Sequence, residues 1–298
     1  MWIKPSAVLG AFACLLVLAS CSSNATSDGR PLVIASFYPF AFVAEQVGGD
    51  SIQVDNLTPP GAEPHDLELS PQQVADLTNA SLVIFENGFQ PAVDDGIDQA
   101  NLSDQAKLDV ASVVNTMDAT GSDEGTFDPH VWLDPVMMQQ ITMATAEHLG
   151  EIDPAHQKQY ERNADRLVTK LRDLDTAYRE GLANCQRRTI VTSHDAFGYL
   201  ARRYDLEQIP IAGIDPHAEP SPAQQAHIAD LVQQQGITTV FTETLVSDAV
   251  AESIANETGA SVATLDPIEG LSDATSNENY FDLMRSNLEA IQQANGCT

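Results

Sequence analysis

Residues 160–182 read YERNADRLVTKLRDLDTAYREGL, and this stretch decides the architecture. Apolar or aromatic side chains recur in it at helical spacing, at Tyr160, Ala164, Leu167, Val168, Leu171, Leu174, Tyr178 and Leu182. The pattern predicts one long amphipathic helix within residues 153–184. A helix of about 28 residues spans about 42 Å, which is enough to cross one domain and join it rigidly to another. We therefore expect two domains, connected by this helix.

On both sides of this helix, short β-rich runs alternate with helical stretches, which predicts an α/β fold with parallel sheets covered by helices. In the first lobe, residues 31–152, we expect strands at 32–37, 51–58, 81–87 and 107–111 and helices at 71–80 and 135–149. In the second lobe, residues 185–298, we expect strands at 189–193, 207–214, 238–243 and 260–265 and helices at 197–204, 222–235, 247–258 and 277–294.

The two halves resemble each other. Ser70-Pro71-Gln72-Gln73 leads to a strand that ends at Glu86, and Ser221-Pro222-Ala223-Gln224-Gln225 leads to a strand that ends at Glu243. This weak internal repeat predicts two similar lobes that face each other. Because open α/β sheets bind ligands at the carboxyl ends of their strands, we expect the binding site in the cleft between the lobes.

The N-terminus has the features of an export signal. Lys4 precedes an apolar run from Ala7 to Ala19 that is too short to span a bilayer as a helix. Leu18-Ala19-Ser20-Cys21 resembles the lipobox of bacterial lipoproteins, so we expect a signal peptide at 1–20, a lipid on Cys21 and a tether at 21–30. The mature protein would then be extracytoplasmic and anchored to the cell membrane. The alternative is an ordinary cleaved signal with an incidental cysteine.

Of the four cysteines, Cys14 belongs to the signal and Cys21 to the anchor, which leaves Cys185 and Cys297. Two thiols in an exported protein are expected to pair, so the sequence predicts a disulfide between them. The alternative is two free buried thiols.

The composition indicates which partners to expect. Apolar residues make up 43% and charged residues 19%, as in globular proteins that fold in water. The net charge is -29, which argues against nucleic acid or an anionic membrane surface as a partner, because both need basic patches. An acidic surface suits the capture of cations or a salty habitat, and a well-solvated surface accounts for most of these carboxylates.

Three histidines and one aspartate follow predicted strands. His65 lies in a Pro- and Gly-rich loop, His130 lies in Asp-Pro-His-Val-Trp, His194 ends a strand, and Asp266 follows the last strand. Three imidazoles and one carboxylate form a ligand set that suits zinc. A single histidine in such a position is more often a hydrogen-bonded structural residue than a ligand, so the prediction depends on their joint placement. We interpret the remaining four histidines as surface residues: His148, His156, His217 and His227.

These segments resemble the metal-binding receptors of zinc and manganese ABC importers, the cluster A-I solute-binding proteins. The resemblance is carried by the loop before His65 and by residues 128–135, 193–199 and 219–222, and it spans nearly the whole mature chain. It implies two α/β lobes bridged by one long helix, with the metal at their interface on His65, His130, His194 and Asp266. Glu243 fits a supporting role behind these ligands. The implied partners are an ABC permease and its ATPase, and the receptor is expected to be a monomer.

One difference from the family concerns residues 117–128. Many zinc-specific members carry a long histidine-rich loop before the second ligand, whereas this segment is short, acidic and free of histidine. Zn²⁺ is the expected cargo, with Mn²⁺ or Fe²⁺ as alternatives.

A zinc hydrolase is a competing hypothesis. The sequence lacks a His-Glu-x-x-His helix and a Gly-x-Ser-x-Gly elbow, so we expect that the protein is not an enzyme. An adhesin role is a further alternative, for which the sequence offers no ligand.

Overall fold

The computed structural model describes residue 2 and residues 29–119 and 127–298. Apart from residue 2, the predicted signal peptide lies outside these residues, as does Cys21, so the signal and the anchor remain predictions. Within the described ranges, no helix is both long enough and apolar enough to cross a membrane.

The N-terminal lobe is built on a four-stranded parallel sheet with the order β2-β1-β3-β4. Its strands are β1 (Leu32–Ala35), β2 (Gln53–Asn56), β3 (Leu82–Phe85) and β4 (Lys107–Asp109). Its helices are α1 (Tyr38–Gly48), α2 (Pro71–Asn79), α3 (Pro91–Ala100) and α4 (Pro135–Ile152). Short 3-10 turns lie at η1 (Gly49–Ser51), η2 (Asp104–Ala106), η3 (Val110–Ser112) and η5 (Val131–Leu133).

The C-terminal lobe repeats this topology. Its sheet has the order β10-β9-β7-β8 and is also parallel, with strands β7 (Thr189–Thr192), β8 (Glu207–Pro210), β9 (Thr239–Thr242) and β10 (Ser261–Thr264). Its helices are α6 (Gly198–Tyr204), α7 (Pro222–Gln235), α8 (Ala249–Thr258) and α9 (Tyr280–Asn295). In each lobe the first strand in sequence pairs with the second strand on one side and with the third on the other, and the fourth strand pairs with the third. The predicted fold of two similar α/β lobes is confirmed.

Matching caps begin two equivalent helices. The Ser70 hydroxyl accepts the Gln73 N–H at the start of α2, and the Ser221 hydroxyl accepts the Gln224 N–H at the start of α7. In both helices proline occupies the first turn, where its missing N–H costs nothing. The sequence repeat therefore corresponds to a repeated strand–loop–helix unit.

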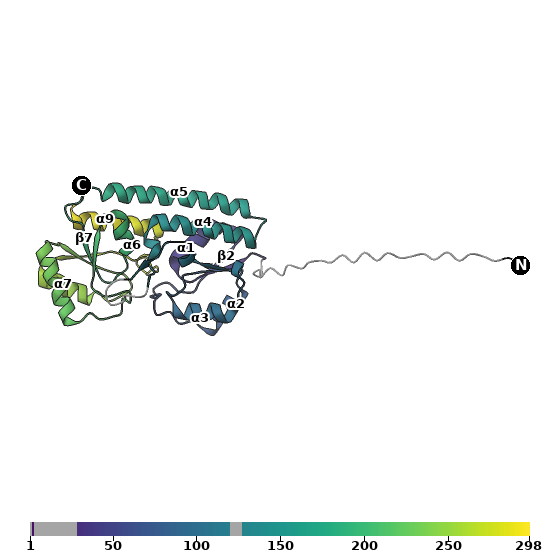
Figure 1. The fold of residues 1–298 in the computed structure, drawn as a ribbon, viewed down its shortest axis with the longest axis horizontal. Coiled ribbons are helices and arrows are strands. Elements are labelled where there is room, and N and C mark those ends of the chain that lie inside the picture. Colours follow the sequence, from purple (N-terminus) through teal and green to yellow (C-terminus); the bar gives the residue numbers. More distant parts are fainter. Residues whose placement is uncertain (1, 3–28, 120–126) are drawn as a thin grey trace.

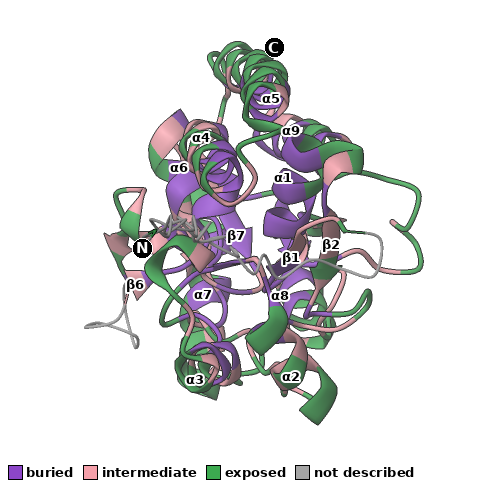
Figure 2. Ribbon diagram, turned by 90° about the vertical axis from the view of Figure 1, so that its right-hand side faces the viewer, coloured by how far each residue is buried: buried purple, intermediate pink, exposed green. Residues whose placement is uncertain are grey.

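The long predicted helix is α5 (Gln157–Gly181), which has 25 residues and a length of about 38 Å. It runs alongside α4 across both lobes (Figure 1). It packs on α1 of the first lobe and on α9 of the second. One apolar cluster continues through both lobes and includes Phe40, Trp132, Tyr178, Phe241 and Tyr280. Figure 2 shows the buried residues gathered on α1, β1 and β7. The lobes therefore share a core and a common helical support.

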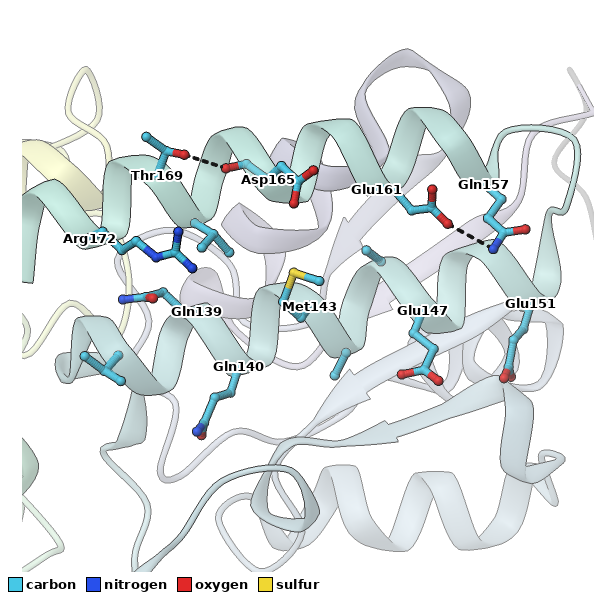
Figure 3. Close-up of a pocket in the computed structure, with 14 residues that line it drawn as sticks. Gln139, Gln140, Met143, Glu147, Glu151, Gln157, Glu161, Asp165, Thr169 and Arg172 are labelled. Carbon is cyan, nitrogen blue, oxygen red and sulfur yellow. Dashed lines mark hydrogen bonds between the residues drawn. The ribbon is translucent and has the colours of Figure 1, made fainter.

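A groove of about 1390 Å³ lies between α4 and α5 (Figure 3). Its lining includes Glu147, Glu151, Glu161 and Asp165, with Arg172 near one end. The groove contains none of the predicted metal ligands.

A disulfide joins Cys185 to Cys297, as predicted from their compartment and number. The two cysteines are 112 residues apart in sequence, so the bond closes the C-terminal lobe on itself. Backbone bonds run alongside it, because the Gln186 N–H donates to the Asn295 carbonyl at 3.0 Å. The end of the chain is thereby fixed to the first residues of its lobe.

Replacing both cysteines with serine is expected to lower the free energy of unfolding by up to about 4.7 kcal/mol, since a loop of this length gains that much entropy when it opens in the unfolded chain. Urea unfolding of the oxidised protein and of the double variant measures the difference. A reductant should destabilise the parent protein and leave the double variant unchanged. Two thiols that can be alkylated in the native protein would contradict the pairing.

Candidate metal centre

Three of the predicted ligands meet between the lobes. His65 lies on the loop from β2 to α2, and His130 follows the strand β6 (Phe127–Asp128), which pairs with β5 (Met117–Asp118). His194 follows β7 of the second lobe. Glu269, on the loop after β10, joins them. Each lobe therefore supplies two residues to this cluster, here called the inner group: His65, His130, His194 and Glu269.

The inner group is almost completely buried. The side chains of His130 and His194 are 0% exposed, that of Glu269 is 1% exposed and that of His65 is 9% exposed. Burying a polar group costs a large amount of free energy unless the group is hydrogen-bonded or binds an ion. Their convergence in the interior indicates a binding role rather than a solvated surface cluster.

The four facing atoms have the spacing of a tetrahedral metal site. The Nε2 atoms of His130 and His194 are 3.2 Å apart, and Glu269 Oε1 lies 3.3, 3.4 and 3.5 Å from the Nε2 atoms of His65, His130 and His194. Donors bound at 2.0–2.1 Å to one tetrahedral zinc ion lie about 3.3–3.4 Å from each other. These four distances therefore match a zinc site, and all four donor atoms of the inner group lie within 4.8 Å of one another.

Two further carboxylates orient the imidazoles. Asp128 Oδ1 lies 2.8 Å from Nδ1 of His130, and Glu243 Oε1 lies 2.8 Å from Nδ1 of His194. Both carboxylates also accept the backbone N–H of the histidine that they orient. A hydrogen bond from Nδ1–H to a carboxylate leaves the lone pair on Nε2, which faces the centre of the group. Glu243 therefore lies directly behind His194, on the side away from the centre of the group.

The charges in the inner group depend on each other. Burial raises the pKa of Glu269, but hydrogen bonds from the three imidazoles outweigh it and hold this pKa well below the ordinary value. Burial lowers the pKa of His130 and of His194, whereas their carboxylate partners raise it, so that both pKa values lie above the ordinary one. Positive charge is therefore favoured on His130 and His194 beside their carboxylates, and a dication at the centre would supply that charge in place of protons.

The sequence placed Asp266 among the ligands, and the structure instead brings Glu269 to that position. Asp266 Oδ1 accepts the Ile268 N–H at 2.7 Å, and Oδ2 accepts the Thr244 hydroxyl at 3.1 Å. These bonds fix a turn in which Ile268 has a φ of +58°. The turn places Glu269, three residues later, against the histidines. Burial raises the pKa of Asp266 to about 6.

Aromatic side chains form one wall of the inner group. The ring of His65 packs edge-on against Phe89, and that of His130 lies 5.1 Å from Trp132. Trp132 Nε1–H donates to the carbonyl of Pro267 at 2.7 Å, which links the His130 segment to the turn that holds Glu269. The wall therefore fixes ligand positions in both lobes as well as excluding water.

The other four histidines lie outside the inner group. His148, His156 and His227 are at least partly exposed, and His156 Nδ1 lies 2.7 Å from Asp153 Oδ2. His217 is half exposed, but it faces Glu63 and Asp66 of the other lobe rather than open solvent. Its interpretation as a plain surface residue was therefore incomplete.

Known proteins match both the sequence and the fold. A family model described as zinc-uptake complex component A, periplasmic (ZnuA), matches residues 33–294. The chain is 33% identical over 305 residues to the zinc-binding lipoprotein AdcA of Streptococcus pneumoniae (strain ATCC BAA-255 / R6), covering 98% of this chain and 61% of AdcA. It is 31% identical over 319 residues to the high-affinity zinc uptake system protein ZnuA of Bacillus subtilis (strain 168), covering 99% and 98%.

The crystal structure of Zn(II)-bound AdcA from Streptococcus pneumoniae matches the fold with a TM-score of 0.78 and 32% identity. The match covers 90% of this chain and 58% of that one. The chain therefore spans about three fifths of the AdcA relatives and nearly all of the Bacillus protein.

Proposed function

The chain belongs to the ZnuA family of periplasmic zinc-uptake components, and from that premise we propose that it is an extracytoplasmic receptor that captures zinc and delivers it to an ABC importer. The observation that carries this proposal is the inner group, in which four donor atoms from two lobes converge at tetrahedral spacing. His65, His130, His194 and Glu269 would bind the metal, and Asp128 and Glu243 would orient two of the imidazoles.

The geometry favours a receptor over a zinc hydrolase. Catalytic zinc sites keep one position for water or substrate, whereas closed zinc sites fill all four positions with protein ligands. Here Glu269 takes the fourth position, and the group is enclosed between the lobes. Because two ligands come from each lobe, a bound ion would hold the lobes together, and its release would require them to separate.

Domain organisation and location follow from the same proposal. Residues 1–20 would be removed as a signal, Cys21 would carry the lipid, and residues 21–30 would tether the receptor to the membrane. The lobes would comprise residues 31–152 and 185–298, joined by the helix within 153–184. The implied partners are a permease and an ATPase, the relatives being components of zinc uptake. We expect a monomer.

Zinc should displace manganese at equal concentration. Three nitrogen donors favour zinc, because affinity for divalent metals rises from manganese towards copper and zinc stays well above manganese. Competition calorimetry on the mature chain measures this preference, and His194→Glu is expected to shift it towards manganese by replacing a nitrogen donor with a harder oxygen. If the unmodified protein bound manganese as tightly as zinc, the assignment of zinc as the cargo would be wrong, although the protein could still be a metal receptor.

Replacing Glu243 with alanine is expected to weaken zinc binding by about 10- to 100-fold, the usual effect of losing a partner that orients a ligating histidine. His194 would keep its place after β7 but lose the acceptor for its Nδ1–H and for its backbone N–H. Calorimetry with a chelator competitor measures the change.

Glu86→Gln is the matched control. Glu86 follows β3 as Glu243 follows β9, it is buried, and neither carboxyl oxygen has a hydrogen-bond partner. Burial raises the pKa of Glu86 well above the ordinary carboxyl value, so glutamine imitates its neutral form. We expect no more than about a threefold change in zinc affinity for this variant. Equal losses in the two variants would contradict a specific role for Glu243.

A further inference from the structure

A second group of possible ligands lies beside the inner group. Glu63 and Asp66 lie on the N-terminal lobe's loop that carries His65, and His217 lies on the C-terminal lobe's loop between β8 and α7. His217 Nε2 is 3.6 Å from Glu63 Oε2 and 4.0 Å from Asp66 Oδ2. These three residues, here called the outer group, bring an imidazole from one lobe to two carboxylates of the other.

Glu63 is the unusual member of the outer group. Its side chain is nine-tenths buried, yet Oε2 has no hydrogen-bond partner. Its other oxygen, Oε1, accepts the His65 N–H at 2.9 Å and lies 3.8 Å from His65 Nε2. One carboxylate oxygen therefore supports an inner ligand, while the other faces the outer group without a donor.

A buried carboxylate oxygen without a donor is costly unless a cation or a proton balances it. The distances from His217 are too long for hydrogen bonds, but they suit donors on different sides of one ion. An imidazole nitrogen with two carboxylate oxygens is a set that zinc and similar divalent metals accept, with water in the remaining positions.

We infer that the outer group is a second, weaker divalent-cation site at the rim of the lobe interface. It offers three donors instead of four, and the side chains of Asp66 and His217 are 76% and 50% exposed, so water competes for the ion. A cation there would tie the His65 loop to the C-terminal lobe. That loop already touches the lobe, because the Gly61 N–H donates to the Leu271 carbonyl at 2.8 Å. The inference stands on the outer group alone and does not need the proposed function.

Zinc calorimetry on the mature, metal-stripped chain tests this site. We expect one tight step and a second step with a dissociation constant between about 1 μM and 1 mM. His217→Ala and Asp66→Asn should each weaken the second step by at least about 10-fold. Both variants should keep the tight step, which also shows that they fold.

His156→Ala is the control. His156 resembles His217, since its side chain is 47% exposed and lies beside a carboxylate, but it lies at the start of α5 and is not a member of the outer group. This variant should keep both steps. The inference is overturned if no second step occurs up to about 1 mM zinc, if it survives in His217→Ala, or if His156→Ala removes it equally. If the parent protein showed no tight zinc-binding step, that result would instead contradict the proposed function.

Discussion

Replacing His194 with alanine is expected to weaken zinc binding by more than about 100-fold, because losing a ligand should cost more than losing the partner of a ligand. Its Nε2 lies 3.2 Å from that of His130 and 3.5 Å from Glu269, so no neighbouring side chain can take its place without moving. Removal would also leave Glu243 buried without the imidazole that pairs with it. Chelator-competition calorimetry on the mature chain measures the loss.

His227→Ala is the control for this prediction. His227 is exposed on α7, away from the inner group, and its replacement should leave zinc affinity unchanged. His65→Ala and His130→Ala should behave like His194→Ala. A comparable loss in His227→Ala, or full affinity in His65→Ala, would refute the assignment of the ligands.

Replacing Glu269 with alanine is expected to cost at least about 100-fold in zinc affinity. Glu269 contributes the only carboxylate oxygen of the inner group, and without it a dication would lie among three neutral imidazoles in a buried site. The uncompensated charge makes this loss large. Affinity is again measured by chelator competition.

Asp266→Asn distinguishes the two carboxylates. The asparagine oxygen can still accept the Ile268 N–H, so the turn that positions Glu269 should persist. We expect its zinc affinity to stay within about threefold of the parent value, below the range for orienting residues. A large loss in Asp266→Asn together with a small loss in Glu269→Ala would restore Asp266 as the ligand and contradict the geometry described above.

The elements with regular patterns were predictable from sequence. The spacing of Tyr160, Leu167, Leu174 and Tyr178 predicted α5, whose inner face buries all four. The Ser-Pro starts of α2 and α7 predicted two helices and their equivalence. Parallel strands end at one edge of a sheet, and this rule brought His194 and Glu243 together, since they follow the neighbouring strands β7 and β9.

Several features escaped prediction, among them α1, α3 and the position of Glu269, and for α1 and Glu269 the physical reason is plain. α1 is buried on most of its surface, so residues such as Phe40, Phe42 and Val43 show no alternation between polar and apolar faces. The rule that ligands lie at the carboxyl ends of parallel strands selects Asp266, after β10, and Glu269 lies three residues farther along the chain. The signal that could have revealed it is Asp266-Pro267, because an aspartate that caps its own turn is not free to bind a metal.

X-ray absorption at the zinc edge, together with metal analysis of the mature chain, tests the central claim most directly. We predict one tightly bound zinc per chain once weakly bound metal has been removed by dialysis, held by four nitrogen or oxygen atoms at about 2.0–2.1 Å, with the scattering pattern of three imidazoles and no sulfur ligand. The Glu269→Ala sample should show an oxygen from water in place of the carboxylate. A chain that retains no stoichiometric metal after exposure to zinc, or whose zinc has fewer than three imidazole ligands, would contradict the account.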